Sequence, residues 1–185
     1  MKPKRILIGG GARSGKSSYA LHLARHLGER RWFVATAQAL DLEMQQRIAR
    51  HQAERGADFT TIEEPVEVAA ALDDVAGADV VVVDCLTLWL SNLLVRGENQ
   101  RRIHERLDTL TAAIHRARFH LILVTNEVGM GLVPETPLGR LFRDVSGHAH
   151  QRLSQEMDEV YVAILGTILR LKPGPVEVRP SRSES

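Results

Sequence analysis

A glycine-rich loop between an apolar strand and a helix limits the possible folds of this chain more than any other segment. Residues 10–17 read Gly-Gly-Ala-Arg-Ser-Gly-Lys-Ser and satisfy the pattern G-x-x-x-x-G-K-[ST]. They follow the apolar run 5–8 and open a segment of helical period over residues 16–27. Because the P-loop requires this context of strand, loop and helix, the sequence predicts a P-loop nucleotide-binding protein.

Short apolar runs alternate with helical segments along the rest of the chain. The expected strands are residues 5–8, 32–35, 80–83, 120–125 and 160–165, with a weaker one at 168–171. The expected helices are residues 16–27, 41–55, 66–75, 98–118 and, with a break, 138–157. This alternation predicts the α/β class, with a mostly parallel sheet flanked by helices. Gly28, Gly56 and Gly77 are expected to end helices as left-handed caps.

The length and composition predict one domain and exclude several kinds of protein. Of the 185 residues, 44% are hydrophobic, so residues 1–172 can form a single nucleotide-binding domain, and the Pro-, Gly-, Ser- and Arg-rich residues 173–185 are expected to be a flexible tail. A net charge of +1 gives no reason to expect nucleic-acid binding. The longest stretch without a charged residue, 85–95, is too short to span a membrane. The basic N-terminus precedes too short an apolar run for a signal peptide, so a cytoplasmic location is expected.

The P-loop assigns chemical roles to its own residues and to one distant acid. The residues expected to bind nucleotide phosphates are Gly10, Gly11, Ala12, Arg13, Ser14, Gly15, Lys16 and Ser17. Lys16 supplies a charge for the β and γ phosphates, and Ser17 is a candidate ligand of Mg²⁺. Four valines followed by Asp84 have the form of a Walker B strand, so Asp84 is the second candidate for the Mg²⁺ site. The single cysteine, Cys85, is expected to be a small buried residue and excludes an internal disulfide.

Two classes of P-loop protein do not fit the sequence. A GTPase switch needs an N-K-x-D motif, and the nearest candidate, residues 125–128, lacks both the lysine and the aspartate. A DNA-translocating ATPase is expected to carry a basic stripe or further domains, and neither is visible. A small-molecule transferase remains.

A histidine on the expected helix 41–55 is a candidate nucleophile. His51 lies close to Arg47, Arg50 and Arg55. Cationic neighbours favour the neutral imidazole, whose free lone pair can attack phosphorus. Because the chain has eight histidines, one of them near arginines is also expected by chance, and spacing alone leaves its role open.

Five blocks of sequence resemble the bifunctional adenosylcobinamide kinase / adenosylcobinamide-phosphate guanylyltransferase family of cobalamin biosynthesis. They are residues 10–17, 34–37, 47–55, 84–94 and 126–134, and Arg140, Phe142, Arg143 and Asp144 extend the last block. The resemblance covers roughly residues 5–172 in order. One departure is His150-Gln151, where Asn-Gln is expected in the family, and the resemblance places His150 near the corrinoid.

The resemblance implies two successive reactions and a set of site residues. Members phosphorylate the aminopropanol hydroxyl of adenosylcobinamide with ATP or GTP, and then transfer GMP from GTP to that phosphate through a GMP-histidine, for which His51 stands. The implied GTP site, beyond the P-loop, comprises Ala35, Thr36, Ala37, Gln52, Ala53, Glu54, Arg55, Glu63 and Asp84. The candidates for corrinoid binding are Glu127, Arg140, Arg143 and Asp144. The resemblance also implies Mg²⁺ and a homotrimer with active sites between subunits.

Three interpretations stay open at this stage. The leading one is the bifunctional enzyme. A guanylyltransferase without the kinase step and a non-catalytic nucleotide-binding regulator are the alternatives. Residues 128–134, which contain two glycines, form either a mobile cover over the site or a plain loop from strand to helix.

Overall fold

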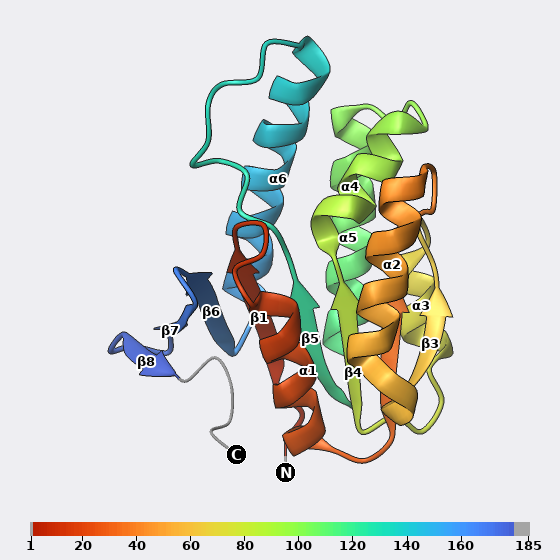
Figure 1. Ribbon diagram of the computed structural model, residues 1–185, viewed down its shortest axis with the longest axis vertical. Helices are drawn as coiled ribbons and strands as arrows, with labels where there is room; N and C mark the ends of the chain where they lie inside the picture. The colour runs from red at the N-terminus through yellow and green to blue at the C-terminus, as the bar shows by residue number, and fades with distance from the viewer. Residues whose placement is uncertain (1, 180–185) are drawn as a thin grey trace.

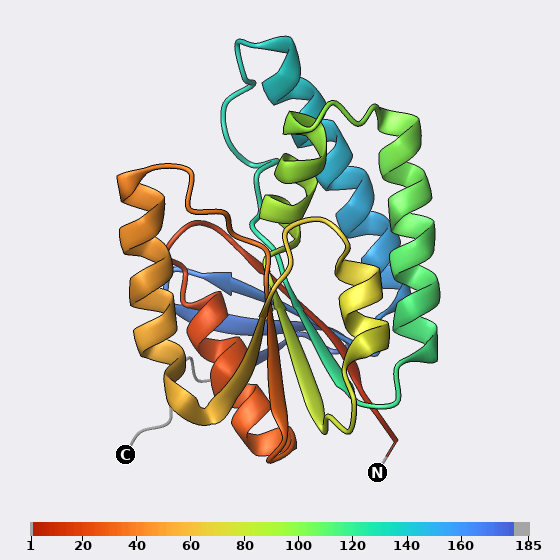
Figure 2. The same cartoon turned by 90° about the vertical axis from the view of Figure 1, so that its right-hand side faces the viewer.

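The computed structural model describes residues 2–179, which form one mostly parallel sheet between two layers of helices (Figures 1 and 2). The strand order is β3-β2-β4-β5-β1-β6-β7-β8. The strands are β1 (Arg5–Gly10), β2 (Arg31–Ala35), β3 (Phe59–Glu63), β4 (Val80–Asp84), β5 (His120–Val124), β6 (Glu159–Ile164), β7 (Thr167–Lys172) and β8 (Glu177–Arg179). Strands β1 to β6 pair in parallel, and β7 and β8 extend the sheet in the antiparallel direction. The predicted α/β class is confirmed.

The helices divide between the two faces of the sheet because alternate strand residues point to opposite faces. The helices are α1 (Lys16–Leu27), α2 (Leu42–Arg55), α3 (Val68–Asp74), α4 (Leu86–Val95), α5 (Gln100–Arg116) and α6 (Pro137–Glu156). On one face, Val81 and Leu123 pack in a core with α3, α4, α5 and α6. On the other face, Val82 and Ile122 pack against α1. Helix α2 stands on the α1 side, outside both cores except for its last residue (Figure 2).

Three elements and two details differ from the sequence expectation. The expectation omitted β3, α4 and β8, and α6 is continuous rather than broken. Gly28 is extended rather than left-handed; a Cβ there would lie 2.3 Å from the Cβ of Asp79, so close approach of two segments explains the glycine. Gly56 has a positive φ of 67° directly after α2, as expected, whereas α3 ends at Val75, two residues before Gly77.

The C-terminal part of the chain is more ordered than the sequence predicted. Within residues 173–185, expected to be a flexible tail, Glu177–Arg179 forms β8 and pairs with β7. The rest of that prediction, residues 180–185, lies outside the described part of the chain. None of the helices among the described residues is both long and apolar enough to cross a membrane.

The parallel strands end at one edge of the sheet, where the loops that follow β1, β2, β4 and β5 come together (Figure 1). Ligands of open α/β sheets bind at this carboxyl edge. Strand β5 lies between the P-loop strand β1 and the strand that ends in Asp84. The edge therefore brings the P-loop, Asp84 and the segment after β5 into one region.

Candidate functional site

A cleft of about 830 Å³ opens at the carboxyl edge of the sheet, between the P-loop and α2. The sequence-predicted residues that line it are Ala12, Arg13, Ser14, Gly15, Lys16, Ser17, Ala35, Ala37, His51, Gln52, Glu54, Arg55, Glu63 and Asp84. Segments far apart in the chain thus contribute to one cavity. Its volume is in the range of cavities that hold small molecules and cofactors.

The backbone of the P-loop depends on glycine at two positions. Gly15 has a φ of +93° and immediately precedes α1, a left-handed conformation that L side chains rarely adopt. A Cβ on Gly10 would lie 2.6 Å from the carbonyl oxygen of Ala163 and 2.7 Å from Oγ of Ser14. The loop therefore folds tightly against β6 and leads into the positive end of α1.

Lys16 lies at the base of the cleft and is only 5% exposed. Its Nζ donates a hydrogen bond of 3.0 Å to the carbonyl oxygen of Gly11, within the same loop. Burial lowers the pKa of Lys16, and the nearby charge of Asp84 acts in the opposite direction. A buried ammonium of this kind gains most from an anion placed beside it.

The end of β4 places an acid and a thiol in the cleft. Asp84 is half-buried and lines the cavity with Ser17. The next residue, Cys85, is buried, and burial raises the pKa of its thiol to about 11. Because nucleophilic cysteines need a lowered pKa, Cys85 is an inert packing residue, as the sequence predicted.

Helix α2 forms the second wall of the cleft and is held mainly at its C-terminal end. The Asp41 carboxylate caps its first turn by accepting a hydrogen bond of 2.7 Å from the N–H of Met44. Arg55 is the helix's buried residue, and its guanidinium lies over the ring of Phe33. Burial lowers the pKa of Arg55, whereas Asp84 and Glu63 raise it. Arg55 therefore joins α2 to the acids on the sheet.

His51 faces the cleft from the C-terminal half of α2, and its side chain is 40% exposed. Its Nδ1 lies 3.7 Å from a carboxylate oxygen of Glu54, one turn further along the helix. The sequence argument considered only the arginines around His51 and missed this acid. A carboxylate beside Nδ1 favours the tautomer with the proton on Nδ1, which leaves the lone pair on Nε2.

The wall opposite α2 is held by two residues whose roles the sequence reasoning missed. The Nδ2 group of Asn92 donates to the carbonyl oxygens of Thr36 at 2.8 Å and Pro65 at 3.0 Å. The indole N–H of Trp89 donates to the carbonyl oxygen of Val66 at 2.8 Å. Both donors belong to α4 and fix the segments that follow β2 and β3. The block 84–94 therefore acts as a strap beneath the cleft.

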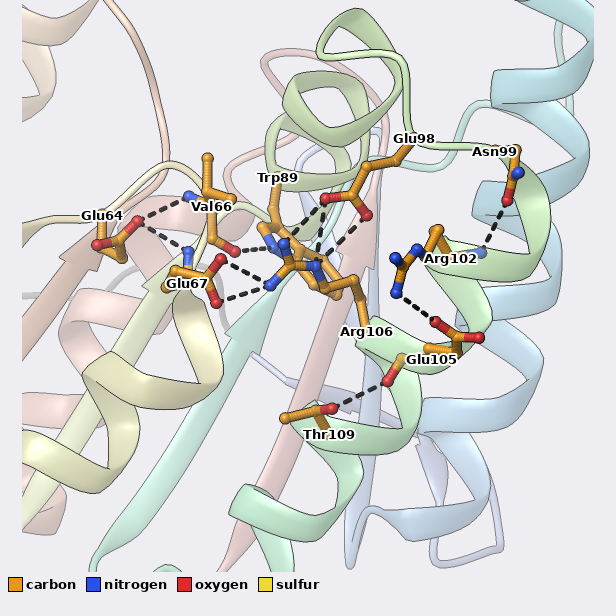
Figure 3. A network of polar contacts seen from close by, with 10 residues as sticks. All are labelled: Glu64, Val66, Glu67, Trp89, Glu98, Asn99, Arg102, Glu105, Arg106 and Thr109. Carbon is orange, nitrogen blue, oxygen red and sulfur yellow. Dashed lines mark hydrogen bonds and ion pairs between the residues drawn. The ribbon is translucent and has the colours of Figure 1, made fainter.

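Charged residues extend this strap away from the cleft (Figure 3). The Glu64 carboxylate accepts from the N–H groups of Val66 and Glu67, both at 2.8 Å. Arg106 of α5 bridges Glu67 at 2.6 Å and Glu98 at 3.0 Å. The loop after β3 is therefore attached to both α4 and α5.

Some predicted nucleotide residues do not line the cleft. Gly10 and Gly11 form the base of the P-loop, and Ala53 lies on the exposed side of α2. Thr36 is fully buried, and its hydroxyl both donates to the carbonyl oxygen and accepts from the N–H of Cys85, each at 2.8 Å. The lining residues that the prediction omitted include Gln38, Leu40, Glu43 and Asn126.

The four candidates for corrinoid binding lie outside the lining of this cleft, around the connection from β5 to α6. Arg140 donates to the carbonyl oxygens of Pro134 and Glu135, and so holds the loop before α6. Arg143 is half-buried, with no hydrogen-bond partner for Nη1 among the described residues, and Asp144 is exposed. Glu127 follows β5 directly and contacts His150 of α6.

Comparison with known proteins gives consistent matches over almost the whole chain. The family model described as "Cobinamide kinase / cobinamide phosphate guanyltransferase" matches residues 6–171. The chain is 43% identical over 173 residues to "Bifunctional adenosylcobalamin biosynthesis protein CobP" of Pseudomonas aeruginosa, covering 93% of this chain and 99% of that protein. It is 38% identical over 180 residues to "Bifunctional adenosylcobalamin biosynthesis protein CobU" of Salmonella typhimurium, covering 90% and 99%.

Solved structures share the fold at much lower identity. One of them, the ATPase domain of a larger protein, superposes with a TM-score of 0.58 at 13% identity, covering 96% of this chain and 81% of that one. The RadB recombinase superposes with a TM-score of 0.52 at 14% identity, covering 100% and 84%. These two likenesses support the P-loop fold and carry no information about the substrate.

Proposed function

Because the chain belongs to the cobinamide kinase / cobinamide phosphate guanyltransferase family, we propose how its residues divide the two reactions between them. The enzyme phosphorylates cobinamide and transfers a guanylyl group to cobinamide phosphate. In the proposed scheme the acceptor is the aminopropanol hydroxyl of adenosylcobinamide, the phosphate donor is ATP or GTP, and the final product is adenosylcobinamide-GDP. The observation that carries the scheme is that His51 and the P-loop line the same cleft.

The P-loop binds the triphosphate in both reactions. Its N–H groups and the start of α1 contact the phosphate oxygens, and Lys16 leaves the carbonyl of Gly11 to pair with the anion. Positioning and charge stabilisation supply most of the catalysis in phosphoryl transfer, so the loop contributes to both steps. Asp84 and Ser17 present a carboxylate and a hydroxyl to the same cleft.

Asp84 and Ser17 fit a Mg²⁺ ion that arrives with the nucleotide. Mg²⁺ prefers oxygen ligands and usually takes one or two from the protein, with water and phosphate completing its shell. When bound, the ion neutralises charge on the phosphates. Asp84 would hold it from the end of β4 and Ser17 from the first turn of α1.

His51 is the nucleophile of guanylyl transfer. Glu54 holds the proton on Nδ1, and the lone pair of Nε2 attacks the α phosphorus of GTP. The new N–P bond replaces the bond to the bridging oxygen, and pyrophosphate leaves. A phosphate oxygen of cobinamide phosphate then attacks the same phosphorus, the N–P bond breaks, and the imidazole is restored.

The nucleoside end of GTP lies along Ala35, Ala37 and Glu63. The carboxylate of Glu63 suits the hydrogen-bond donors of guanine or the hydroxyls of ribose. Gln52 and Arg55 contribute from α2 on the other side.

A homotrimer completes the proposal. Exposed apolar side chains gather on segments that project beyond the carboxyl edge of the sheet, and they include Leu40, Leu42, Met130, Leu132 and Val133. Exposed apolar patches of this kind mark surfaces that bind another molecule, here a neighbouring subunit. Light scattering tests the trimer, and a monomer at working concentration would contradict it.

Labelling with α-³²P GTP and Mg²⁺ tests the proposed scheme. We expect a phosphoramidate adduct that is labile in acid and stable in alkali, absent in His51→Ala and much reduced in Lys16→Ala. Ala53→Ser, on the exposed side of α2, is the matched control and should label normally. An adduct that persists in His51→Ala would remove the histidine from its role.

A second assay separates the bifunctional enzyme from a transferase alone. Adenosylcobinamide is supplied with ATP in the absence of GTP, and the phosphate ester is measured by mass spectrometry. We expect the ester to form. If only guanylyl transfer to supplied cobinamide phosphate is seen, the kinase half of the proposal is wrong.

A further inference from the structure

A second group of polar residues lies beside the P-loop, on the side of α6. It comprises Thr125 and Glu127, which follow β5, and His150, which lies on α6. The backbone N–H of Glu127 donates to the carbonyl oxygen of Gly10 at 2.9 Å. Glu127 is therefore fixed next to the first residue of the P-loop, although it does not line the nucleotide cleft.

The carboxylate of Glu127 is held in one orientation. Its Oε1 accepts a hydrogen bond of 2.5 Å from the N–H of Gly129, and its Oε2 lies 3.8 Å from Nδ1 of His150. A Cβ on Gly129 would lie only 2.8 Å from Oε1, so the loop can close on the carboxylate only with glycine at this position. The glycine-containing segment after β5 thus positions Glu127.

His150 acts on Glu127 from the other side. Its Nε2 lies 2.7 Å from Oγ1 of the buried Thr125, and burial lowers the pKa of the imidazole, while the charge of Glu127 opposes that effect. A neutral ring facing a carboxylate carries its proton on Nδ1, so Nε2 accepts from the Thr125 hydroxyl. Thr125 fixes the imidazole, and the imidazole N–H faces the carboxylate.

The Glu127 carboxylate remains reachable from solvent, since its side chain is 33% exposed. A carboxylate that is oriented by neighbours, accessible and adjacent to a P-loop has the features of a proton acceptor for a hydroxyl that attacks the last phosphate. In protein kinase chemistry an acidic side chain has this role. The residues that line the nucleotide cleft are already occupied by phosphate binding and guanylyl transfer in the proposed function.

We propose that Glu127 accepts the proton of the substrate alcohol in the kinase step and that His150 is its positioning residue. The alcohol oxygen forms a bond to the γ phosphorus, the bond from that phosphorus to the bridging oxygen breaks, and the nucleoside diphosphate leaves. The hydroxyl proton passes to the Glu127 carboxylate and from there to solvent. This inference rests on the kinase activity of the proposed function.

The guanylyl transfer has no such requirement. Cobinamide phosphate is a monoester, and the second pKa of a phosphate monoester is about 6, so its oxygen is already an anion at neutral pH. The attack on the guanylylated His51 therefore needs no proton acceptor. Glu127 is expected to affect one reaction of the enzyme and to leave the other unchanged.

Glu127→Gln tests this division. Glutamine can keep the contact with the N–H of Gly129 but cannot accept a proton at neutral pH. We expect the kcat for phosphorylation of adenosylcobinamide to fall by ~100-fold or more, the usual contribution of a general base. Labelling of His51 by α-³²P GTP and transfer to supplied cobinamide phosphate should stay within about threefold of wild type, a change too small for loss of a catalytic group.

Glu135→Gln, an exposed acid in the same loop, is the matched control and should retain both activities. Phosphorylation within about threefold of wild type in Glu127→Gln would overturn the proposal, since removing a base cannot be that mild. An equal loss of both activities would also overturn it. Loss of the His51 adduct in the wild type would instead count against the proposed function itself, so the two failures are distinguishable.

His150 is tested by its dependence on Glu127. His150→Ala should lower the kcat of the kinase step without raising the KM for nucleotide, and His150→Asn, which retains an N–H donor, should recover part of the loss. In the Glu127→Gln background, His150→Ala should cause little further loss, because residues that act together are not additive. Additive losses would show that His150 acts only on stability and would overturn its positioning role.

Discussion

The guanidinium carbon of Arg55 lies 4.1 Å from the centre of the Phe33 ring, and this contact joins the C-terminal end of α2 to the sheet. Arg55 is the buried residue of α2, and its carbonyl oxygen also accepts a hydrogen bond of 3.2 Å from Arg25. His51 lies one turn before it and takes its direction from this anchor. Holding the nucleophile therefore depends on a single stacked arginine.

Replacing Arg55 tests the anchor. Arg55→Lys keeps a positive charge but loses the flat stacking surface, a contact worth about 0.5–2 kcal/mol. We expect the rate of His51 labelling by α-³²P GTP to fall by ~10-fold, as a small misplacement of a reacting group predicts. The thermal unfolding midpoint should change little, because α2 adds few residues to the core. Normal labelling in Arg55→Lys would show that α2 is positioned by other contacts.

Asn92→Leu removes the strap under the opposite wall of the cleft. Two carbonyl oxygens, those of Thr36 and Pro65, lose their side-chain donor. We expect a loss of about 1–3 kcal/mol in the free energy of unfolding, together with a raised KM for GTP, because the segments after β2 and β3 separate. Urea unfolding and steady-state kinetics measure the two effects.

Asn99→Ala is the matched control for the strap. Asn99 caps α5 by accepting a hydrogen bond of 3.0 Å from the N–H of Arg102, away from the cleft. Its loss should reduce stability by about 1 kcal/mol without changing the KM. If both variants raise the KM equally, the effect belongs to stability in general and the strap has no special role.

The buried His150 gives the protein a pH dependence of known sign. Its pKa is lowered in the folded state below the ordinary value of 6.5, chiefly by burial. Between those two values the unfolded chain binds more protons, so the free energy of unfolding should fall as the pH drops below about 6.5. His150→Asn should make this decline shallower. Urea unfolding at several pH values from about 7.5 down to about 5 measures it, and an unchanged slope would contradict the assignment.

The sequence predicted the residues of the site better than their arrangement. The P-loop and Asp84 were found because strand context and spacing define them, and both contribute to the cleft. The orientation of His51 by Glu54 was missed, because the argument counted only positive neighbours. Thr36 was assigned to the nucleotide from resemblance, whereas its hydroxyl bonds to Cys85 within the core.

The missed elements have physical explanations as well. Helix α4 (Leu86–Val95) is apolar on nearly every side, so it shows no helical period, and its polar residue Asn92 gave no signal until its two carbonyl partners were known. Strand β3 (Phe59–Glu63) is a short edge strand with one buried residue, which is too weak a pattern to detect. The family resemblance is confirmed, while the trimer, the role of Mg²⁺, the cytoplasmic location and the absence of nucleic-acid binding stay predictions.

Arg143 of α6 gives a prediction in which stability and function move in opposite directions. Its Nη1 is buried without a hydrogen-bond partner among the described residues, and such a group destabilises a fold by about 1–3 kcal/mol. Arg143→Met should therefore keep or raise the thermal unfolding midpoint. It should also weaken binding of cobinamide phosphate by ~10-fold, as expected when a charged hydrogen bond to a ligand is lost. Calorimetry measures both, with Arg152→Met as control on the same helix. Lower stability with unchanged affinity would assign Arg143 to the fold instead.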